Sequence, residues 1–507
     1  MKKLGIGISD FKELIKGNYI YVDKTEYIYK LINSGKYYFL SRPRRFGKSL
    51  FLSTIRYLFE GQRELFKGLY IEDKWEWEEI YPVIRISFAK DIKRKEDLKS
   101  RIREELEKNY ERNEEEIEEK KKDEGSLLEK LVIKINKKKR KQVVVLVDEY
   151  DKPILDVIED RKEAEEVRKE LKGFYSVLKD LDEYIKFVII TGVSKFSKVS
   201  LFSGLNQLED ISLSKEYGNI CGYTREELEF YFREYLEGVN IEEIREWYNG
   251  YSFLGDRLYN PFDILLYLKN REFDNYWYES GKTEFLFKLL KRKEYKLGYL
   301  EKEYYTKEIL EKFDIEYISI EALMYQTGYL TIKETKRIEN ERVYVLGYPN
   351  REVRQSFNRE LLYYITGEYQ SDRTSKLKMA LIEEDMEEIR RQIEIFLETI
   401  SYEVMKNENV YQAAIYGLMY GMGYEVEIED RTIKGRIDLT LMINRKKVYI
   451  IELKLIEREE EKGKAIKQIE EREYYKKYMN YDKIYIVGIE IDRNKKRIEN
   501  YEYKRVK

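Results

Sequence analysis

The sequence predicts an α/β protein of about three domains. At 507 residues the chain is longer than one hydrophobic core usually supports. Residues 1–215 alternate short apolar segments with long amphipathic ones, an order typical of a sheet covered by helices. Residues 216–400 are expected to be mostly helical, and residues 401–507 to form a second, smaller α/β domain.

The absence of one residue type excludes whole classes of chemistry. The chain contains no His and one Cys, Cys221. Ser-His-Asp triads, Cys-His proteases, HExxH zinc sites and internal disulfides are therefore excluded. Any catalytic metal must be held by oxygen ligands, which favours Mg²⁺ or Mn²⁺. Any general base must be a carboxylate, Lys or Tyr.

Charge and hydropathy limit where the protein can be located and what it can bind. Hydrophobic residues make up 42% of the chain and charged residues 38%, as in a folded, highly charged protein. The net charge of −2 argues against a uniformly basic surface, although a local basic groove remains compatible with it. No segment resembles a signal peptide or approaches the ~20 apolar residues of a membrane span, so we expect a cytoplasmic protein with no membrane contact.

The first domain is expected to contain four buried strands. A helix from Lys48 to about Phe59 should follow the first strand directly. The apolar runs that predict the strands are residues 37–40, 83–88, 143–147 and 187–190.

Residues 41–49, SRPRRFGKS, have the features of a phosphate-binding loop between a strand and a helix. Gly47, Lys48 and Ser49 fit the pattern GxxxxGK[ST], whereas Arg42 occupies the position of the first Gly. Lys48 can reach the β- and γ-phosphates, and the Ser49 hydroxyl can bind Mg²⁺. With Arg42 in place of glycine, we expect a different backbone path, set by Pro43. The nucleotide-binding residues of the loop are predicted to be Arg45, Phe46, Gly47, Lys48, Ser49 and Leu50.

Two further strands end in polar residues that suit nucleotide hydrolysis. In QVVVLVDEYD, residues 142–151, Asp148 can hold Mg²⁺ through water and Glu149 can orient and deprotonate the attacking water. FVIITGVSKF reaches Thr191, which is positioned like a sensor of bound nucleotide. The alternative, a Thr that merely ends a strand, stays open. Arg44 or Arg45 could stabilise the γ-phosphate charge or contact nucleic acid.

Together these motifs resemble a known family. RPRRFGKSL, VVLVDEYDKPI, ITGVSKFS, NGYSF and LYNPFDIL are similar to the AAA-ATPase-like proteins that carry a C-terminal PD-(D/E)XK nuclease-superfamily domain. The resemblance implies a P-loop NTPase domain of the additional-strand class in residues 1–215, with ATP as cofactor. It also implies a helical middle domain in residues 216–400 and a restriction-endonuclease-like domain in residues 401–507.

The C-terminal residues themselves suggest a metal site. Asp438 lies 14 positions before Glu452 (452 − 438), and Lys454 is two positions further on. Alternate residues of a strand share a face, so Glu452 and Lys454 should point the same way and Asp438 should join them from an adjacent strand. Two carboxylates can hold one or two hard cations, and Lys454 can position water or stabilise developing charge. The alternative interpretation of these three residues is that they are charged side chains on an edge strand with no metal-binding role.

The resemblance implies further roles around this cluster. Asp438, Glu452 and Lys454 match the family's D…ExK core, with Ile437 at the place of the Pro, and Gly435–Arg436 match its GRxD sequence. Gln412 stands where relatives often have His. The additional residues implied are Glu408 as a metal ligand, and Gln468 and Tyr474, on the following helix, as residues that support the site or touch DNA.

The leading hypothesis is an ATP- and Mg²⁺-dependent nuclease acting on nucleic acid, with DNA the favoured kind. The family resemblance adds a role in defence or mobile-element biology. One alternative is an NTP-regulated switch whose nuclease-like domain only binds DNA or a protein partner. A small-molecule kinase is a third and weaker hypothesis, because no separate substrate lobe is evident. Assembly as a homo-oligomer is left open.

Overall fold

The chain forms two compact units in the computed structural model. The first consists of Met1–Lys282 and Tyr304–Asn350, and the second contains Arg351–Lys507. The predicted division into three domains, with boundaries at 215 and 400, stays a prediction. The structure describes residues 1–113, 115, 123–195, 202, 205, 207–280, 286, 304–311, 319–366, 371–399, 408–422, 424–432, 435–443, 446–492, 494–495 and 497–507.

A parallel five-stranded sheet forms the centre of the first unit. Its order is β2-β3-β4-β1-β5, so β4 lies between β1 and β3. The strands are almost continuously apolar because helices cover both faces of a parallel sheet. The α/β fold predicted for this part of the chain is confirmed. The strands are β1 (Tyr37–Ser41), β2 (Val83–Ser87), β3 (Val143–Asp148), β4 (Ile185–Gly192) and β5 (Glu209–Asp210).

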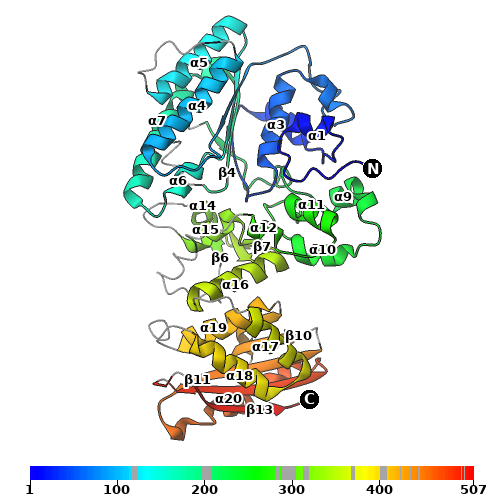
Figure 1. Ribbon diagram of the computed structural model, residues 1–507, viewed down its shortest axis with the longest axis vertical. Coiled ribbons are helices and arrows are strands. Elements are labelled where there is room, and N and C mark those ends of the chain that lie inside the picture. Colours follow the sequence, from blue (N-terminus) through cyan, green and yellow to red (C-terminus); the bar gives the residue numbers. More distant parts are fainter. Residues whose placement is uncertain are drawn as a thin grey trace. The chain divides into compact units, whose positions relative to one another are not determined.

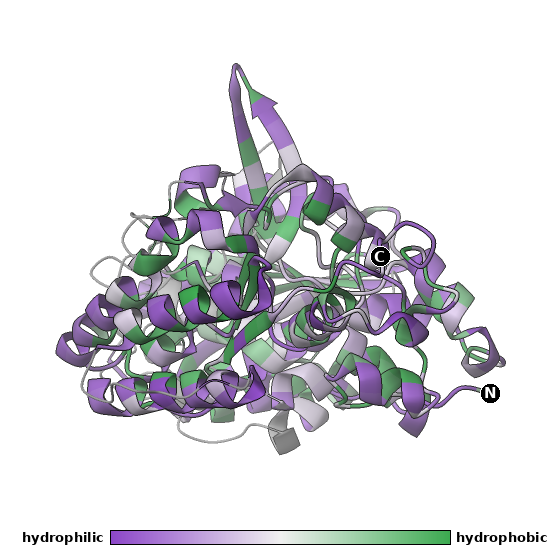
Figure 2. Ribbon diagram, turned by 90° about the horizontal axis from the view of Figure 1, so that it is seen from above, coloured by the Kyte–Doolittle hydropathy of each residue, from purple (hydrophilic) through white to green (hydrophobic). Residues whose placement is uncertain are grey.

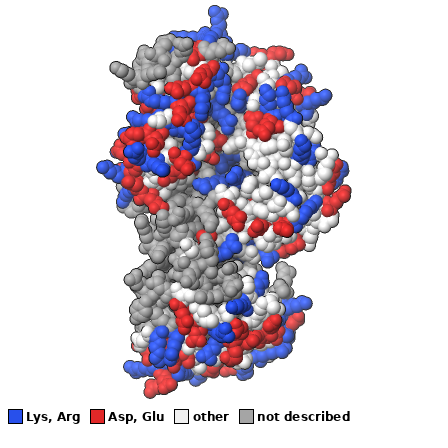
Figure 3. Space-filling model, viewed as in Figure 1, with Lys and Arg blue, Asp and Glu red and all other residues white. Residues whose placement is uncertain are grey.

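Helices flank this sheet on two sides. One group is α4 (Lys95–Arg112), α5 (Glu124–Lys139) and α7 (Arg161–Asp180), and the other is α1 (Phe11–Lys16) and α3 (Lys48–Phe59). The two groups lie on opposite sides of β4 in Figure 1. Hydrophobic and hydrophilic residues share the same helices, as the mixed green and purple ribbons of Figure 2 show. Acidic and basic side chains are interspersed over the visible surface (Figure 3), in agreement with the near-zero net charge.

The rest of the first unit is built from short helices and a small sheet. Aromatic side chains such as Tyr248, Tyr259 and Tyr267 form a buried cluster here. A three-stranded sheet of order β6-β8-β7 follows. The elements are α2 (Thr25–Ser34), α6 (Lys152–Asp156), α9 (Arg225–Tyr231), α10 (Ile241–Tyr248), α11 (Pro261–Asn270), α12 (Tyr276–Glu279), β6 (Tyr304–Thr306), α14 (Lys307–Glu311), α15 (Ile320–Thr327), β7 (Thr331–Ile338) and β8 (Glu341–Gly347).

The second unit is a mixed sheet packed with helices. Its order is β13-β12-β11-β10-β9, with β11 and β12 parallel and the other pairs antiparallel. The elements are α16 (Arg351–Thr366), α17 (Ser371–Glu383), α18 (Met386–Glu398), α19 (Glu408–Gly421), β9 (Glu425–Thr432), β10 (Gly435–Ile443), β11 (Lys447–Ile456), α20 (Lys464–Arg472), β12 (Lys483–Asp492) and β13 (Ile498–Arg505).

Alternation along β11 determines which helix covers which face. Val448 and Ile450 pack in one hydrophobic cluster with Ile469 of α20. The intervening Tyr449 is buried, and its hydroxyl donates to the carbonyl oxygen of Leu381 in α17. Helices therefore cover both faces of this sheet, and the residues that continue the α20 face of β11 are Glu452 and Lys454.

Within the described ranges, every helix is too short or too polar to span a lipid bilayer.

One carboxylate fixes the turn between α17 and α18. Glu384 lies 2.6 Å from the ammonium groups of Lys447 and Lys483 and accepts a 2.6 Å hydrogen bond from the Tyr485 hydroxyl. These contacts, with the Lys447 hydrogen bond the strongest, lower the pKa of Glu384 to about 2. The turn is thereby tied to the starts of β11 and β12.

We expect Glu384→Gln to destabilise the second unit by about 1–2 kcal/mol at pH 7, because charge-assisted hydrogen bonds become neutral ones. The folded-state pKa lies below the usual value of 4.5, so the stabilisation is present above pH 4.5 and is lost as pH falls through about 2. Urea unfolding at pH 7 and pH 2.5 measures it, with the exposed Glu383→Gln as control. An equal gap between wild type and Glu384→Gln at both pH values would contradict this assignment.

Candidate functional site

The loop between β1 and α3 has the geometry to receive phosphate. Its backbone turns at two residues with positive φ, Arg45 (65°) and Gly47 (93°). Gly47 is the N-cap of α3, and no side chain in the described part of the chain caps the first-turn N–H groups of that helix. These N–H groups and the positive end of the helix dipole therefore face the loop, where an anion is stabilised. Ser49 and Leu50 lie half-buried in the first turn.

Lys48 is folded back onto its own loop. Its ammonium donates to the carbonyl oxygens of Arg42 at 2.8 Å and Pro43 at 2.9 Å, and the residue is only 7% exposed. Burial lowers the pKa of Lys48, and the Asp148 carboxylate is the strongest charge opposing that shift. The ammonium is therefore held beside the phosphate loop and within the influence of the carboxylate that ends β3.

The polar ends of β3 and β4 meet. The Thr191 hydroxyl donates to Asp148 Oδ1 at 2.9 Å, and Asp148 is 2% exposed. Glu149 has a left-handed backbone, with φ of 54°, as the chain leaves β3. Burial, followed by the charge of Asp148, raises the pKa of Glu149. A carboxylate with a raised pKa is suited to accept a proton from water near neutral pH.

Two of the predicted loop residues contact aromatic rings from later segments of the chain. The Phe46 ring is buried and meets Tyr251 edge-on, with centroids 4.8 Å apart. The Arg45 guanidinium lies 4.8 Å above the Phe262 ring. Any nucleotide contact from Phe46 must therefore come from its main chain. Tyr251 and Phe262 belong to NGYSF and LYNPFDIL, segments whose role the sequence did not reveal.

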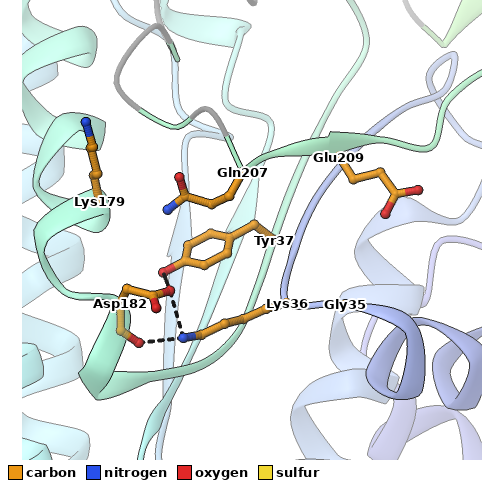
Figure 4. Close-up of a pocket in the computed structure, with 7 residues that line it drawn as sticks. All are labelled: Gly35, Lys36, Tyr37, Lys179, Asp182, Gln207 and Glu209. Carbon is orange, nitrogen blue, oxygen red and sulfur yellow. Dashed lines mark hydrogen bonds and ion pairs between the residues drawn. The ribbon is translucent and has the colours of Figure 1, made fainter.

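A surface depression of about 530 Å³ lies at the opposite end of β1 from the phosphate loop (Figure 4). Lys36 and Tyr37 both donate to Asp182 Oδ1 there, at 2.8 and 2.9 Å. These polar groups satisfy one another, and the structure gives no reason to place the nucleotide in this depression.

In the second unit, three of the predicted residues come together. The antiparallel register sets Leu439 opposite Ile451, which brings Asp438 next to Glu452 on neighbouring strands. Asp438 Oδ2 accepts a 2.8 Å hydrogen bond from the main-chain N–H of Leu453. The Lys454 ammonium donates to Glu452 Oε1 at 3.0 Å.

Glu452 is the most constrained ionisable group of this cluster. It is fully buried, and no described residue donates a hydrogen bond to its Oε2 atom. Burial, and then the charge of Asp438, raises the pKa of Glu452 to about 7. A buried carboxylate oxygen with no donor requires either a proton or a cation.

The donor set fits a hard divalent cation. Asp438 and Glu452 offer only carboxylate oxygens, the ligands that Mg²⁺ and Mn²⁺ prefer. The described part of the chain contains no ready-made group of three acidic, Cys or His ligands, so waters and substrate oxygens would complete the coordination. Glu408 begins α19, and its side chain lies outside the described residues.

Two amides support the carboxylates. Gln468 of α20 donates from Nε2 to Glu452 Oε1, and Gln412 of α19 donates to the main-chain carbonyl of Asp438 at 2.9 Å. Gln412, at the place of the family's His, therefore contacts the strand that carries Asp438.

Tyr474 departs from the expected arrangement. The helix α20 ends at Arg472 because Glu473 adopts a left-handed conformation (φ 51°), and Tyr474 starts a separate 3₁₀ turn. Its hydroxyl accepts a 3.1 Å hydrogen bond from Arg472. A Cβ at Gly435 would lie 2.7 Å from that hydroxyl and closer still to the Arg472 guanidinium, so the glycine leaves room for this hydrogen-bonded pair. The placement of Tyr474 on the same helix as Gln468 is wrong.

Comparison with known proteins identifies the family. A family described as a predicted AAA-ATPase matches residues 5–202, and the PD-(D/E)XK nuclease superfamily matches residues 406–501. The chain is 40% identical over 511 residues to an uncharacterized protein in the vnfD 5′ region of Azotobacter chroococcum mcd 1, covering 99% of this chain and 98% of the relative. The chain belongs to the AAA-ATPase-like family with a C-terminal PD-(D/E)XK nuclease-superfamily domain.

The family resemblance inferred from the motifs is confirmed. No solved structure matches this AAA-ATPase-like protein.

We expect Gly47→Ala to destabilise the first unit by about 1–2 kcal/mol, because an L side chain at φ of 93° is strained. The matched control is Gly173→Ala in α7. An added Cβ would meet no atom within 4 Å at either glycine, but only Gly47 has positive φ. Gly173→Ala should therefore stabilise the chain by up to ~1 kcal/mol. Urea unfolding compares them, and equal effects of both substitutions would refute the backbone argument.

We expect Glu452→Gln to stabilise the metal-free protein above pH 7. The folded-state pKa is raised from 4.5 to about 7, so the stability contributed by the protonated carboxyl is full below pH 4.5 and is lost as pH rises through 7. Glutamine keeps that group neutral at every pH. Melting temperatures in a chelator at pH 5 and pH 8 measure the effect, with the exposed Glu460→Gln as control. A pH-independent difference between wild type and Glu452→Gln would contradict the buried-charge explanation.

Proposed function

We propose that this protein binds and hydrolyses ATP and that its C-terminal domain cleaves nucleic-acid phosphodiesters with Mg²⁺ or Mn²⁺. The observation that carries the proposal is the buried Glu452, with an unbonded carboxylate oxygen beside Asp438 and Lys454. The family's two domain types agree with it. We further propose that the protein acts on DNA in the cytoplasm, in defence or mobile-element biology.

The ATP site is proposed at the carboxyl ends of β1, β3 and β4. The position of β4 between β1 and β3 supports assignment to the additional-strand class of P-loop NTPases. Lys48 would leave its loop carbonyls for the β- and γ-phosphates, and Ser49 with Asp148 would hold Mg²⁺. Thr191 keeps the Asp148 carboxylate oriented through its hydrogen bond.

Glu149 is the proposed general base for hydrolysis. Its raised pKa lets it take a proton from water, and the adjacent charge of Asp148 strengthens its basicity. Arg45 lies in the phosphate loop itself, and its exposed guanidinium, next to the Phe262 ring, is proposed as one of the nucleotide-binding groups.

The nuclease site is proposed on β10 and β11. Asp438 and Glu452 would hold the metal ion, which when bound polarises the scissile phosphate and acidifies water. Lys454 supplies positive charge next to Glu452 and can stabilise the charge that develops on phosphate oxygens. Gln468 and Gln412 hold the two acidic residues in place through Glu452 Oε1 and the Asp438 carbonyl. Glu408 is proposed as a further metal ligand.

We expect purified protein to cut plasmid or single-stranded DNA with Mg²⁺ or Mn²⁺, and Asp438→Ala to reduce the rate at least about 100-fold through loss of a metal ligand. The exposed Asp482→Ala should leave cleavage intact. Gel assays with and without ATP, repeated with Lys48→Ala, show whether nucleotide is regulatory or required.

Cleavage unaffected by Asp438→Ala would overturn the assignment of the site. A gel mobility shift that shows DNA binding, without cleavage in either Mg²⁺ or Mn²⁺, would instead support the NTP-regulated switch. In that case the C-terminal domain binds DNA or a partner without cleaving it.

A further inference from the structure

Arg42 replaces the first glycine of the phosphate-loop pattern, and its side chain is almost entirely buried, at 1% exposure. The guanidinium lies 4.0 Å above the Phe253 ring. Its donors reach only neutral acceptors in the contacts that the structure records, the carbonyl oxygens of Ser41 (2.8 Å), Ser212 (2.9 Å), Tyr217 (2.9 Å) and Gly218 (3.4 Å).

The backbone at residue 42 does not require glycine. Positive φ in this loop occurs at Arg45 and Gly47, whereas Arg42 lies outside the left-handed region. The loop therefore makes its turns at later positions than a glycine at residue 42 would suggest. This leaves residue 42 free to carry a side chain.

Arg42 also contacts Lys48, the lysine of the phosphate-binding motif, through its main-chain carbonyl. Lys48 donates to the Arg42 carbonyl oxygen, while the Arg42 guanidinium donates to Tyr217 and Gly218. Residue 42 is thus the direct junction between Lys48 and the segment that follows β5. A displacement of that segment must move an acceptor of the Lys48 ammonium.

Residues 212–222, which we call the anchoring segment, hold the loop at two more points. The N–H of Ser41 donates to the Ser212 hydroxyl at 2.9 Å, and the N–H of Gly222 donates to the Phe46 carbonyl at 3.2 Å. The anchoring segment therefore contacts the loop at its start and again just before Gly47. It lies beyond residues 5–202, which match the AAA-ATPase family.

We propose that Arg42 is a positioning residue of the nucleotide site, which ties the phosphate loop to the anchoring segment and so fixes the carbonyl oxygens that hold Lys48. This inference rests on the proposed binding of ATP. Restoring the glycine of the ordinary motif with Arg42→Gly weakens nucleotide binding, because the four hydrogen bonds to the loop and the anchoring segment are lost.

The test measures binding of a non-hydrolysable ATP analogue with Mg²⁺ to the full-length chain by calorimetry. We expect Arg42→Gly to weaken binding at least about tenfold and Arg42→Lys to recover part of the loss, since Lys keeps the charge but not the planar fork. The matched control is Arg257→Lys, because Arg257 also donates to main-chain carbonyls, those of Gly250 and Ile332. The affinity of the Arg257→Lys variant for the ATP analogue should stay within about twofold of that of wild type. Binding by Arg42→Gly as tight as wild type overturns the inference.

A second measurement separates positioning from general destabilisation. Ser212→Ala removes the acceptor for the Ser41 N–H and is a smaller change, so it serves if Arg42→Gly does not fold. Melting temperatures are recorded for Arg42→Lys and Ser212→Ala with and without the analogue. Positioning predicts that the nucleotide-induced rise shrinks, because that rise depends on affinity. If the melting temperatures with and without the analogue fall by the same amount, the nucleotide-induced rise is unchanged. Arg42 then has only a structural role, and the inference is refuted.

Failure of the underlying ATP proposal gives a different result. In that case wild type shows no nucleotide-induced rise, and Lys48→Ala behaves like wild type. If wild type binds the analogue, Lys48→Ala does not, and the Arg42 and Ser212 variants bind normally, only the positioning role fails.

Discussion

A buried ammonium sets the arrangement of the first unit. Burial removes water from the Lys48 ammonium, and the carbonyl oxygens of Arg42 and Pro43 replace it as hydrogen-bond acceptors. The direction of these two carbonyl groups depends on the path of the loop. That path requires positive φ at Arg45 and Gly47. Contacts from much later in the chain hold it, through the anchoring segment and through Tyr251 against Phe46. One lysine thus couples the ends of the sheet to segments far away in sequence.

The second unit meets a similar constraint with the opposite charge. Glu452 is buried, and Gln468 and Lys454 both donate to one of its oxygens. Gln468 reaches it because α20 lies close to the sheet, where a Cβ at Gly488 would come within 2.6 Å of the Ile466 nitrogen. Glu490 also fixes the start of α20 by accepting hydrogen bonds from the N–H groups of Gly463 and Ala465. Sheet and helix are therefore fitted to each other around one carboxylate.

The sequence predicted the arrangement of those site residues that are close neighbours in the chain. Gly47, Lys48 and Ser49 are neighbours in the chain, and the two-residue period of a strand places Glu452 and Lys454 on one face. The separation of Tyr474 from the helix of Gln468 was not predictable, because the left-handed conformation of Glu473 has no strong sequence signal. The role of Phe46 was also hidden, since nothing near residue 46 indicates that Tyr251 covers its ring.

By itself, the sequence determined the α/β class, the family and the identity of the charged groups, because apolar periodicity and short motifs depend on neighbouring residues. The tertiary structure alone decided what each buried charge contacts. Arg42 illustrates the division: its position in the motif was evident, but its acceptors at Ser212, Tyr217 and Gly218 follow β5 and come close only when the sheet is assembled. A buried charge needs partners in space, and spacing along the chain cannot name partners that lie some 170 residues away.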